Sequence, residues 1–153
     1  MSRDVALPTI LVAEDHNHDK FILTEVFSRA GIRADLRFVN DGEQMLDYLY
    51  RRGPFAAPGA AIMPTLVLLD LNMPRLDGRK VIRILRADET LRHLPVIALS
   101  TSESPKHITE AYAIGINAYL VKPANIPDYV AKVSSLWDFW MRTASLPTVD
   151  VKP

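Results

Sequence analysis

The sequence predicts an α/β protein with a doubly wound, five-stranded parallel sheet. Short apolar segments that lack helical periodicity alternate along the chain with amphipathic segments, which is the pattern of strands and helices joined by right-handed crossovers. Residues 66–69 are apolar and branched, as in a strand buried on both faces of a parallel sheet. This predicted central strand ends on Asp70, and Pro74 and Gly78 then turn the chain toward a helix.

The first third of the chain supplies two further strands and two helices. Residues 9–13 form a short apolar run, which predicts a second central strand that also ends in carboxylates. Apolar residues recur at helical spacing over residues 17–30, and Gly31 ends this helix. Residues 32–39 alternate partly in polarity, which predicts a strand, and the turn at residues 40–42 leads into a second helix.

The rest of the chain repeats this alternation after a loop. The stretch 51–64 is rich in glycine, proline and alanine and cannot continue a helix. Beyond the central strand, periodicity and turn residues predict a helix over 78–87, a strand over 95–99, a helix from Pro105 to Gly115, a strand over 118–121 and a final helix from about 126 to about 141.

Composition and length narrow the function classes. A length of 153 residues fits one domain, so we expect no attached output domain. Lys and Arg together number 18 and Asp and Glu number 18, so no net positive charge favours nucleic acid or a membrane surface. Cysteine is absent, and no apolar run approaches the roughly 20 residues of a membrane span. We therefore expect a cytoplasmic protein whose partners are proteins.

Carboxylates follow two of the predicted strands. Glu14 and Asp15 come after the first strand and Asp70 ends the central one, so all three meet at the carboxyl edge of the sheet. They would repel one another unless a cation lay among them. Oxygen ligands of this kind suit Mg²⁺, and the backbone carbonyl of Asn72 can complete the coordination shell.

The same edge carries groups suited to phosphoryl transfer. An Asp carboxylate beside a divalent ion is a competent nucleophile, which points to Asp70 as the acceptor of an aspartyl phosphate. Lys122, after the fifth strand, can pair with the phosphoryl oxygens, and the Ser100 hydroxyl can donate a hydrogen bond to another. Both groups would position the phosphoryl group and stabilise its charge.

Together these motifs resemble the receiver domain of two-component response regulators. The resemblance covers residues 8–142, leaves 143–153 as a C-terminal tail that we expect to fray from Ser145, and implies a flavodoxin-like (βα)5 fold with strand order 2-1-3-4-5. It also implies that a histidine kinase phosphorylates Asp70 with Mg²⁺, and that the protein is a phosphoacceptor rather than an enzyme. The motifs are Glu14-Asp15, Asp70 to Pro74 with Asp77-Gly78, Ser100, Tyr119 and Lys122-Pro123.

The resemblance assigns three further features. Ser100 and Tyr119 would form the switch pair, although Ser100 stands where the family often has threonine. The Lys122–Pro123 bond would be a cis peptide, as in the family. A narrower resemblance, to the stand-alone receivers paired with phytochrome kinases, comes from the loop before the central strand and from residues 99–102, 122–125, 138–141 and 144–147.

Two other function classes remain open. Haloacid-dehalogenase-like phosphohydrolases also use an Asp nucleophile and Mg²⁺, but they carry a second Asp two residues later as general acid, where this chain has Asn72. A receiver-like scaffold that is never phosphorylated is the third class, although every position needed for phosphorylation is filled. Phosphate-ester turnover, stable stoichiometric labelling or no labelling of Asp70 would separate the three.

Two exposed aromatic positions predict protein contacts. Phe21 lies on the first helix but off its apolar stripe, which favours contact with the kinase. At about 100° per residue Phe139 falls opposite the apolar stripe of the last helix, which favours a homodimer. Trp137 and Trp140 lie on that stripe and are most simply core residues, but they could share the dimer contact at the helix end.

Overall fold

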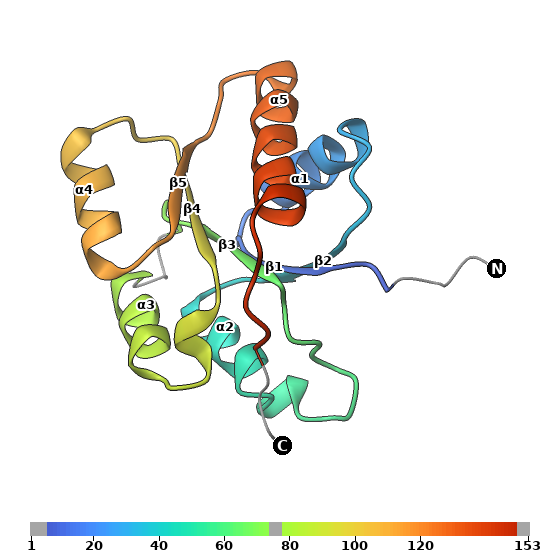
Figure 1. Ribbon diagram of the computed structural model, residues 1–153, viewed down its shortest axis with the longest axis vertical. Coiled ribbons are helices and arrows are strands. Elements are labelled where there is room, and N and C mark those ends of the chain that lie inside the picture. Colours follow the sequence, from blue (N-terminus) through green and yellow to red (C-terminus); the bar gives the residue numbers. More distant parts are fainter. Residues whose placement is uncertain (1–5, 74–77, 150–153) are drawn as a thin grey trace.

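The protein forms the predicted five-stranded parallel sheet, with strand order β2-β1-β3-β4-β5 (Figure 1). The structure is a computed structural model that describes residues 6–73 and 78–149, so the motif residues Pro74 and Asp77 lie outside the described residues. The strands are β1 (Thr9–Ala13), β2 (Asp35–Val39), β3 (Leu66–Asp70), β4 (Val96–Ser100) and β5 (Ala118–Val121).

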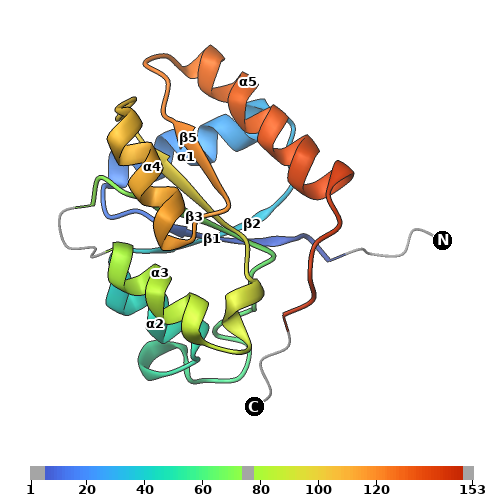
Figure 2. The same cartoon turned by 60° about the vertical axis from the view of Figure 1, so that its left-hand side comes forward.

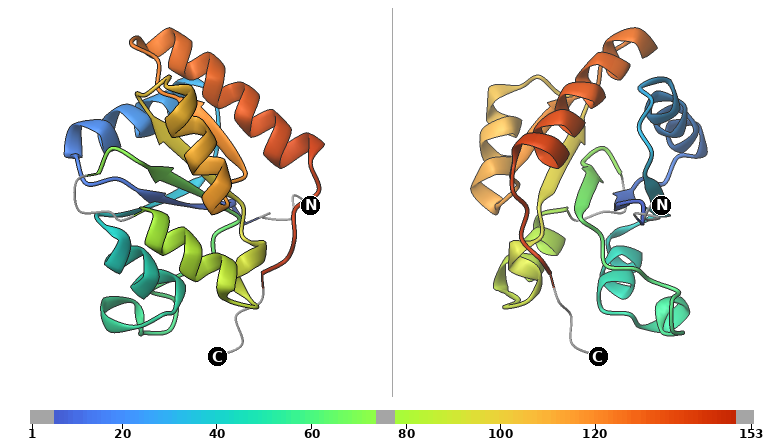
Figure 3. Two further views of the ribbon diagram at one scale, coloured as in Figure 1. Left: turned by 90° about the vertical axis from the view of Figure 1, so that its left-hand side faces the viewer. Right: turned by 45° about the vertical axis from the view of Figure 1, so that its right-hand side comes forward.

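Helices cover both faces of the sheet, as the alternating sequence pattern predicts. Figures 2 and 3 show α1 and α5 together on one face and α2, α3 and α4 on the other. Their bounds are α1 (Asn17–Arg29), α2 (Gly42–Leu49), α3 (Gly78–Ala87), α4 (Pro105–Ile114) and α5 (Ile126–Trp137), with short turns at η1 (Gly53–Phe55), η2 (Leu91–His93) and η3 (Asp138–Thr143). No helix in the described ranges is long and apolar enough to cross a membrane.

Two apolar clusters, one on each face of the sheet, hold these layers together. Every residue of β1, β3 and β4 is buried, because these strands are covered on both faces, which explains their unbroken apolar sequences. Leu68 faces the cluster beneath α1 and α5, whereas Leu69 faces the cluster beneath α2, α3 and α4. Truncation of either leucine to alanine is expected to cost about 2–5 kcal/mol of stability.

The parallel register brings the functional strand ends to one edge. Ala13 pairs with Leu69 and Ser100 pairs with Val121, so Glu14, Asp70 and Lys122 each fall at or just beyond the carboxyl end of neighbouring strands. Ligands bind at this edge in open α/β sheets. The fold therefore places the predicted site where an α/β protein binds its ligands.

The end of the last helix differs from the prediction of one α-helix to about residue 141. The α-helix ends at Trp137 and continues as the wider π-helical turn η3, which is closed by a 2.7 Å bond from the Ala144 N–H to the Phe139 carbonyl. This turn leaves Phe139 53% exposed, whereas Trp137 is 8% exposed and packs edge-on against Phe27 at a centroid distance of 6.0 Å. Within the monomer Trp137 is thus a core residue.

The segment after the last helix has no regular structure but makes an apolar contact. We predicted that the tail frays from Ser145, but Val149 is partly buried against the cluster beneath α2, α3 and α4. The chain therefore passes from the α5 side of the sheet to the opposite side (Figure 1). The prediction that the tail frays from Ser145 stays a prediction, and the contact of Val149 was not visible in local composition.

Candidate functional site

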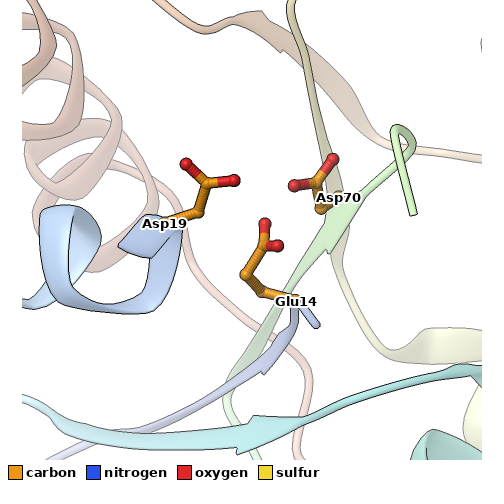
Figure 4. A group of neighbouring side chains, drawn as sticks. All are labelled: Glu14, Asp19 and Asp70. Carbon is orange, nitrogen blue, oxygen red and sulfur yellow. The ribbon is translucent and has the colours of Figure 1, made fainter. Parts of the chain in front are cut away.

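Three carboxylates converge at the carboxyl edge of the sheet. One oxygen from each of Glu14, Asp19 and Asp70 lies within 4.8 Å of the others, and the three side chains point toward one another (Figure 4). Glu14 and Asp70 are only 4% and 2% exposed. Buried carboxylates this close together require a proton or a cation between them.

Asp19 is a member of this group that the sequence analysis missed. It lies in the first turn of α1, soon after the loop that follows β1, and its side chain reaches back toward the strand end. The available signal was an acidic residue in the first turn of a helix that follows a strand end. Acidic residues are common there because a negative charge interacts favourably with the positive end of the helix dipole, so this signal does not single out a metal ligand.

Asp15, the predicted partner of Glu14, lies outside the group of three. Its Oδ1 atom is buried and has no hydrogen-bond partner among the described residues. A buried polar atom without a partner is costly, so this oxygen is available to a cation. The assignment of Asp15 as a metal ligand stays a prediction.

Both oxygens of Asp70 have partners. The Lys122 ammonium donates to Oδ2 at 2.5 Å and also lies 3.6 Å from Glu14 Oε2, while the backbone N–H of Asn72 donates to Oδ1 at 2.8 Å. Lys122 holds this position without the predicted cis peptide. The described residues contain no cis bond, so the Lys122–Pro123 prediction is wrong, and the bond takes the trans form that X–Pro bonds prefer by about 0.5–1 kcal/mol.

The two buried carboxyls at the centre differ in their pKa values. Burial, and then the hydrogen bond with Asp70, raises the pKa of Glu14 to about 8. Burial acts in the same direction on Asp70, but the hydrogen bonds from Glu14 and Lys122 outweigh it and hold the pKa of Asp70 below its ordinary value. Without a metal, Asp70 is therefore ionised at neutral pH and Glu14 carries the proton.

The donor set fits a hard divalent cation. It consists of carboxylate oxygens from Glu14, Asp19 and Asp70, with the unpartnered Asp15 Oδ1 and the Asn72 carbonyl close in sequence, and contains no nitrogen or sulfur ligand. A cation at this place would replace the proton on Glu14. When bound, it supplies positive charge that offsets the carboxylates and orients phosphoryl oxygens.

A second group of polar residues extends from the site toward α4. The buried Ser100 hydroxyl donates to Asn72 Oδ1 at 3.2 Å and accepts from the Ser102 N–H at 3.1 Å. The Tyr119 hydroxyl donates to the Ser102 carbonyl at 2.9 Å. Beside these groups lies a cleft of about 390 Å³ whose lining includes Asn72, Ser100, Tyr119, Glu110 and Ile114. The predicted switch pair thus borders an open space next to the site.

This fold and site define a class of protein. A family description for the response regulator receiver domain matches residues 10–134, and the chain belongs to this family of two-component signalling proteins. Response regulator Rcp1 of Synechocystis sp. is 32% identical over 138 residues, which cover 90% of this chain and 92% of that protein.

Solved structures extend the similarity to phytochrome-associated response regulators. Response regulator RPA3017, from red light signaling of R. palustris, is 75% identical with a TM-score of 0.91 and covers 93% of this chain and 99% of that one. The phosphorylated cyanobacterial phytochrome response regulator RcpA is 34% identical with a TM-score of 0.82, covering 94% and 100%. The Mn²⁺-bound form of Rcp1, at 31% identity and a TM-score of 0.79 with 92% and 99% covered, shows a divalent metal in a relative.

Proposed function

We propose that this protein accepts a phosphoryl group on Asp70 from a histidine kinase and signals through a change in its protein contacts. The observation that carries the proposal is the Asp70 carboxylate, which is buried, ionised and held by Lys122 and the Asn72 N–H beside further carboxylates. A carboxylate oxygen attacks phosphorus, the N–P bond of a phosphohistidine breaks, and the imidazole leaves with its electron pair and takes up a proton.

The surrounding residues position and stabilise the transferred group. Lys122 pairs with the phosphoryl oxygens once the attacking carboxylate carries less charge, and Ser100 can exchange its bond to Asn72 for one to phosphate. Glu14, Asp15, Asp70 and the Asn72 carbonyl are the proposed ligands of Mg²⁺, and Asp19 joins them from α1. The phosphate adds about −1.5 to −2 charge beside Ser100. Ser102 links Ser100 to Tyr119, because its N–H donates to the Ser100 hydroxyl and its carbonyl accepts from the Tyr119 hydroxyl, so a change at Ser100 can reach Tyr119.

The kinase partner is proposed to be of the phytochrome type. RPA3017 is a response regulator in red light signaling, RcpA is a phytochrome response regulator, and both cover nearly the whole of this chain. Phe21 on α1 is 65% exposed and stands on the helix that carries Asp19 toward the site, which suits contact with a kinase domain.

Position 72 argues against the phosphohydrolase alternative. That mechanism needs a carboxylic acid two residues after the nucleophile, and here the Asn72 side chain is an amide that bonds to Ser100 and, at 3.1 Å, to Thr101 Oγ1. An amide in this position cannot protonate a leaving group. The third class, a scaffold that is never phosphorylated, is distinguished by the absence of labelling with a small phosphodonor.

Phosphorylation by a small-molecule donor tests the proposal. With acetyl phosphate and Mg²⁺, the wild-type protein should gain one phosphoryl group per chain by intact-mass spectrometry, and alkaline hydroxylamine should remove it. Asp70→Asn should gain none, whereas the matched control Asp88→Asn should label as wild type does. Label that persists in Asp70→Asn or survives hydroxylamine contradicts the proposal, and an unlabelled wild type supports the scaffold.

A homodimer through the last helix is proposed as the second kind of protein contact. An apolar groove of about 530 Å³ lies between β5 and α5, and Phe139 and Trp140 line it at one end. Their rings pack edge-on at 5.4 Å, with Phe139 largely exposed. An exposed aromatic beside an apolar groove is typical of an interface anchor.

A further inference from the structure

Arg86, in the last turn of α3, makes a set of contacts that phosphoryl transfer does not explain. Its guanidinium donates to the carbonyls of Gly115 at 2.8 Å, Arg92 at 3.0 Å and Leu94 at 2.9 Å, and to Asn117 Oδ1 at 2.9 Å. In the part of the chain that the structure describes, no carboxylate pairs with it. A half-buried cation that bonds only to neutral oxygens is costly unless its donors are used, and here four of the five guanidinium N–H groups make hydrogen bonds.

These contacts connect the C-terminal end of α4 to the edge of the sheet. Gly115 ends α4 in the left-handed region at φ +112°, and a side chain there would place Cβ 3.0 Å from Arg86 Cγ. Asn117 precedes β5, and its Oδ1 also accepts from the Val96 N–H at 2.8 Å at the start of β4. Arg86 therefore holds the end of α4 against two strands and η2.

The other end of α4 is held far more weakly. Ser104 occupies the N-cap position without a side-chain capping bond, and Ala111 is the only buried residue of the helix. The first two turns rest on exposed polar contacts, namely Ser102 Oγ to His107 Nδ1 at 2.7 Å and Arg79 to Glu110 at 2.7 Å. His107 and Glu110 of these turns line the cleft of about 390 Å³ described above, which Ala111 and Ile114 also line. Few buried apolar contacts mark a segment that opens locally.

We propose that Arg86 is a positioning residue that fixes the C-terminal end of α4 as a pivot. Phosphorylation of Asp70 then moves the Ser102 loop and the first two turns of the helix, while residues 111–117 stay in place. α3 and α4 lie side by side on the same face of the sheet, so α3 can serve as the support (Figures 2 and 3). This second half of the inference rests on the proposed function, whereas the anchoring itself does not.

The anchoring can be tested without phosphorylation. Arg86→Met keeps the aliphatic stem and removes all four hydrogen bonds, and Arg83→Met, one turn earlier at an exposed position of α3, is the matched control. Amide exchange by NMR is read at Gly115 and Ile116, which donate to the Tyr112 and Ala111 carbonyls. We expect exchange at both amides about tenfold faster or more in Arg86→Met and unchanged in Arg83→Met. Equal exchange in the two variants overturns the anchor. If Arg86→Met fails to fold, Arg86→Lys is judged by the same criterion.

The pivot is tested with beryllofluoride and Mg²⁺ as the phosphate mimic. In the wild type, exchange should change over residues 101–110 and not over 111–117. In Arg86→Met the change should spread into 111–117. Two results overturn the pivot. One is a change in amide exchange over both 101–110 and 111–117 in the wild type, and the other is a change that stays within 101–110 in Arg86→Met. A wild type without any change over 101–110 contradicts the proposed function and the pivot together, while the exchange at Gly115 and Ile116 still decides the anchor.

Discussion

At the scale of single residues, Asp70 combines burial with a full charge. Burial alone would favour its protonated form, but Lys122 and the Asn72 N–H stabilise the carboxylate, and Glu14 holds the proton that the cluster retains. The proposed nucleophile is therefore ionised before a cation or a phosphodonor arrives. Glu14, which the sequence predicts only as a metal ligand, would also be the group that exchanges a proton for a bound cation.

This exchange predicts a pH dependence of metal binding. Because the pKa of Glu14 is raised to about 8 in the metal-free protein, Mg²⁺ must displace a proton below that pH. The apparent affinity should rise with pH by up to about tenfold per unit and level off above pH 8. Calorimetric titrations at several pH values, in buffers of different ionisation enthalpy, measure both the affinity and the proton release. Glu14→Gln should bind more weakly and without this slope, and a flat wild-type profile would contradict the assignment.

The same shift gives the sign of a stability change. Between the ordinary pKa of 4.5 and the raised value of about 8, the folded protein binds more protons than the unfolded chain. The contribution of Glu14 to the metal-free protein is therefore lost as the pH rises through this window, and Mg²⁺ should offset the loss.

At the scale of elements, short polar contacts hold the connections between helices and strands. Asp88 follows α3, and its Oδ1 accepts from the N–H groups of Thr90 at 2.8 Å and Leu91 at 3.0 Å, while Tyr50 donates to Oδ2 at 2.7 Å. The carboxylate thus caps η2 and ties it to the end of α2. These bonds to Leu91 and Tyr50 hold the pKa of Asp88 below its ordinary value.

Removal of this cap should destabilise the fold. Asp88→Ala is expected to lower the free energy of unfolding by about 1 kcal/mol, the usual cost of losing a capping side chain. Since the folded pKa is depressed, the contribution is present above pH 3.8 and lost as the pH falls through the folded value. Urea unfolding at neutral pH measures the loss, with Glu89→Ala as the neighbouring exposed control. A loss of the same size in Glu89→Ala would assign the effect to the loop in general.

Helix α1 carries the prediction about the kinase. Phe21→Ala should slow phosphoryl transfer from the cognate kinase, because it removes an exposed aromatic contact, and should leave labelling by acetyl phosphate unchanged. Ile62→Ala, which truncates an exposed apolar side chain in the loop before β3, is the control for surface truncation. Equal loss with both phosphodonors would indicate damage to the fold instead of a lost contact.

At the scale of the whole molecule, the helices on the two faces of the sheet are packed differently. On the face under α1 and α5, Phe27 packs edge-on against Trp137 of α5, and Phe139 beyond the end of this helix is exposed. The opposite face carries α4, which is weakly packed at its start and pinned by Arg86 at its end. β5 runs between α4 and α5, so Tyr119, the proposed switch residue, lines both the cleft and the apolar groove.

The predicted homodimer is testable at this scale. Sedimentation velocity at tens of micromolar should show a dimer that beryllofluoride strengthens, since Tyr119 lines the groove beside Phe139. Phe139→Glu should give a monomer, because burying a carboxylate in an apolar interface is unfavourable. Phe21→Glu, on α1, should sediment as wild type. A wild type that stays monomeric in both states, or a dimer that tolerates Phe139→Glu, would refute the interface.

The sequence by itself determined the order of strands and helices and the position of the site at the strand ends. Runs such as residues 66–69 and acids such as Asp70 are local signals, because burial on both faces of a parallel sheet forbids polar residues until the strand ends. The exposure of Phe21 and Phe139 also followed from helical periodicity.

Only the tertiary structure decided which groups meet across the chain. The approach of Asp19 to Asp70, the bonds from Arg86 to Gly115 and Asn117, and the packing of Val149 all depend on contacts between residues far apart in sequence. The trans bond before Pro123 belongs here too, because the intrinsic preference between the two forms is small. Local sequence patterns predict which face of each segment is buried. Which residues contact one another depends on three-dimensional packing, and a short stretch of sequence does not specify that packing.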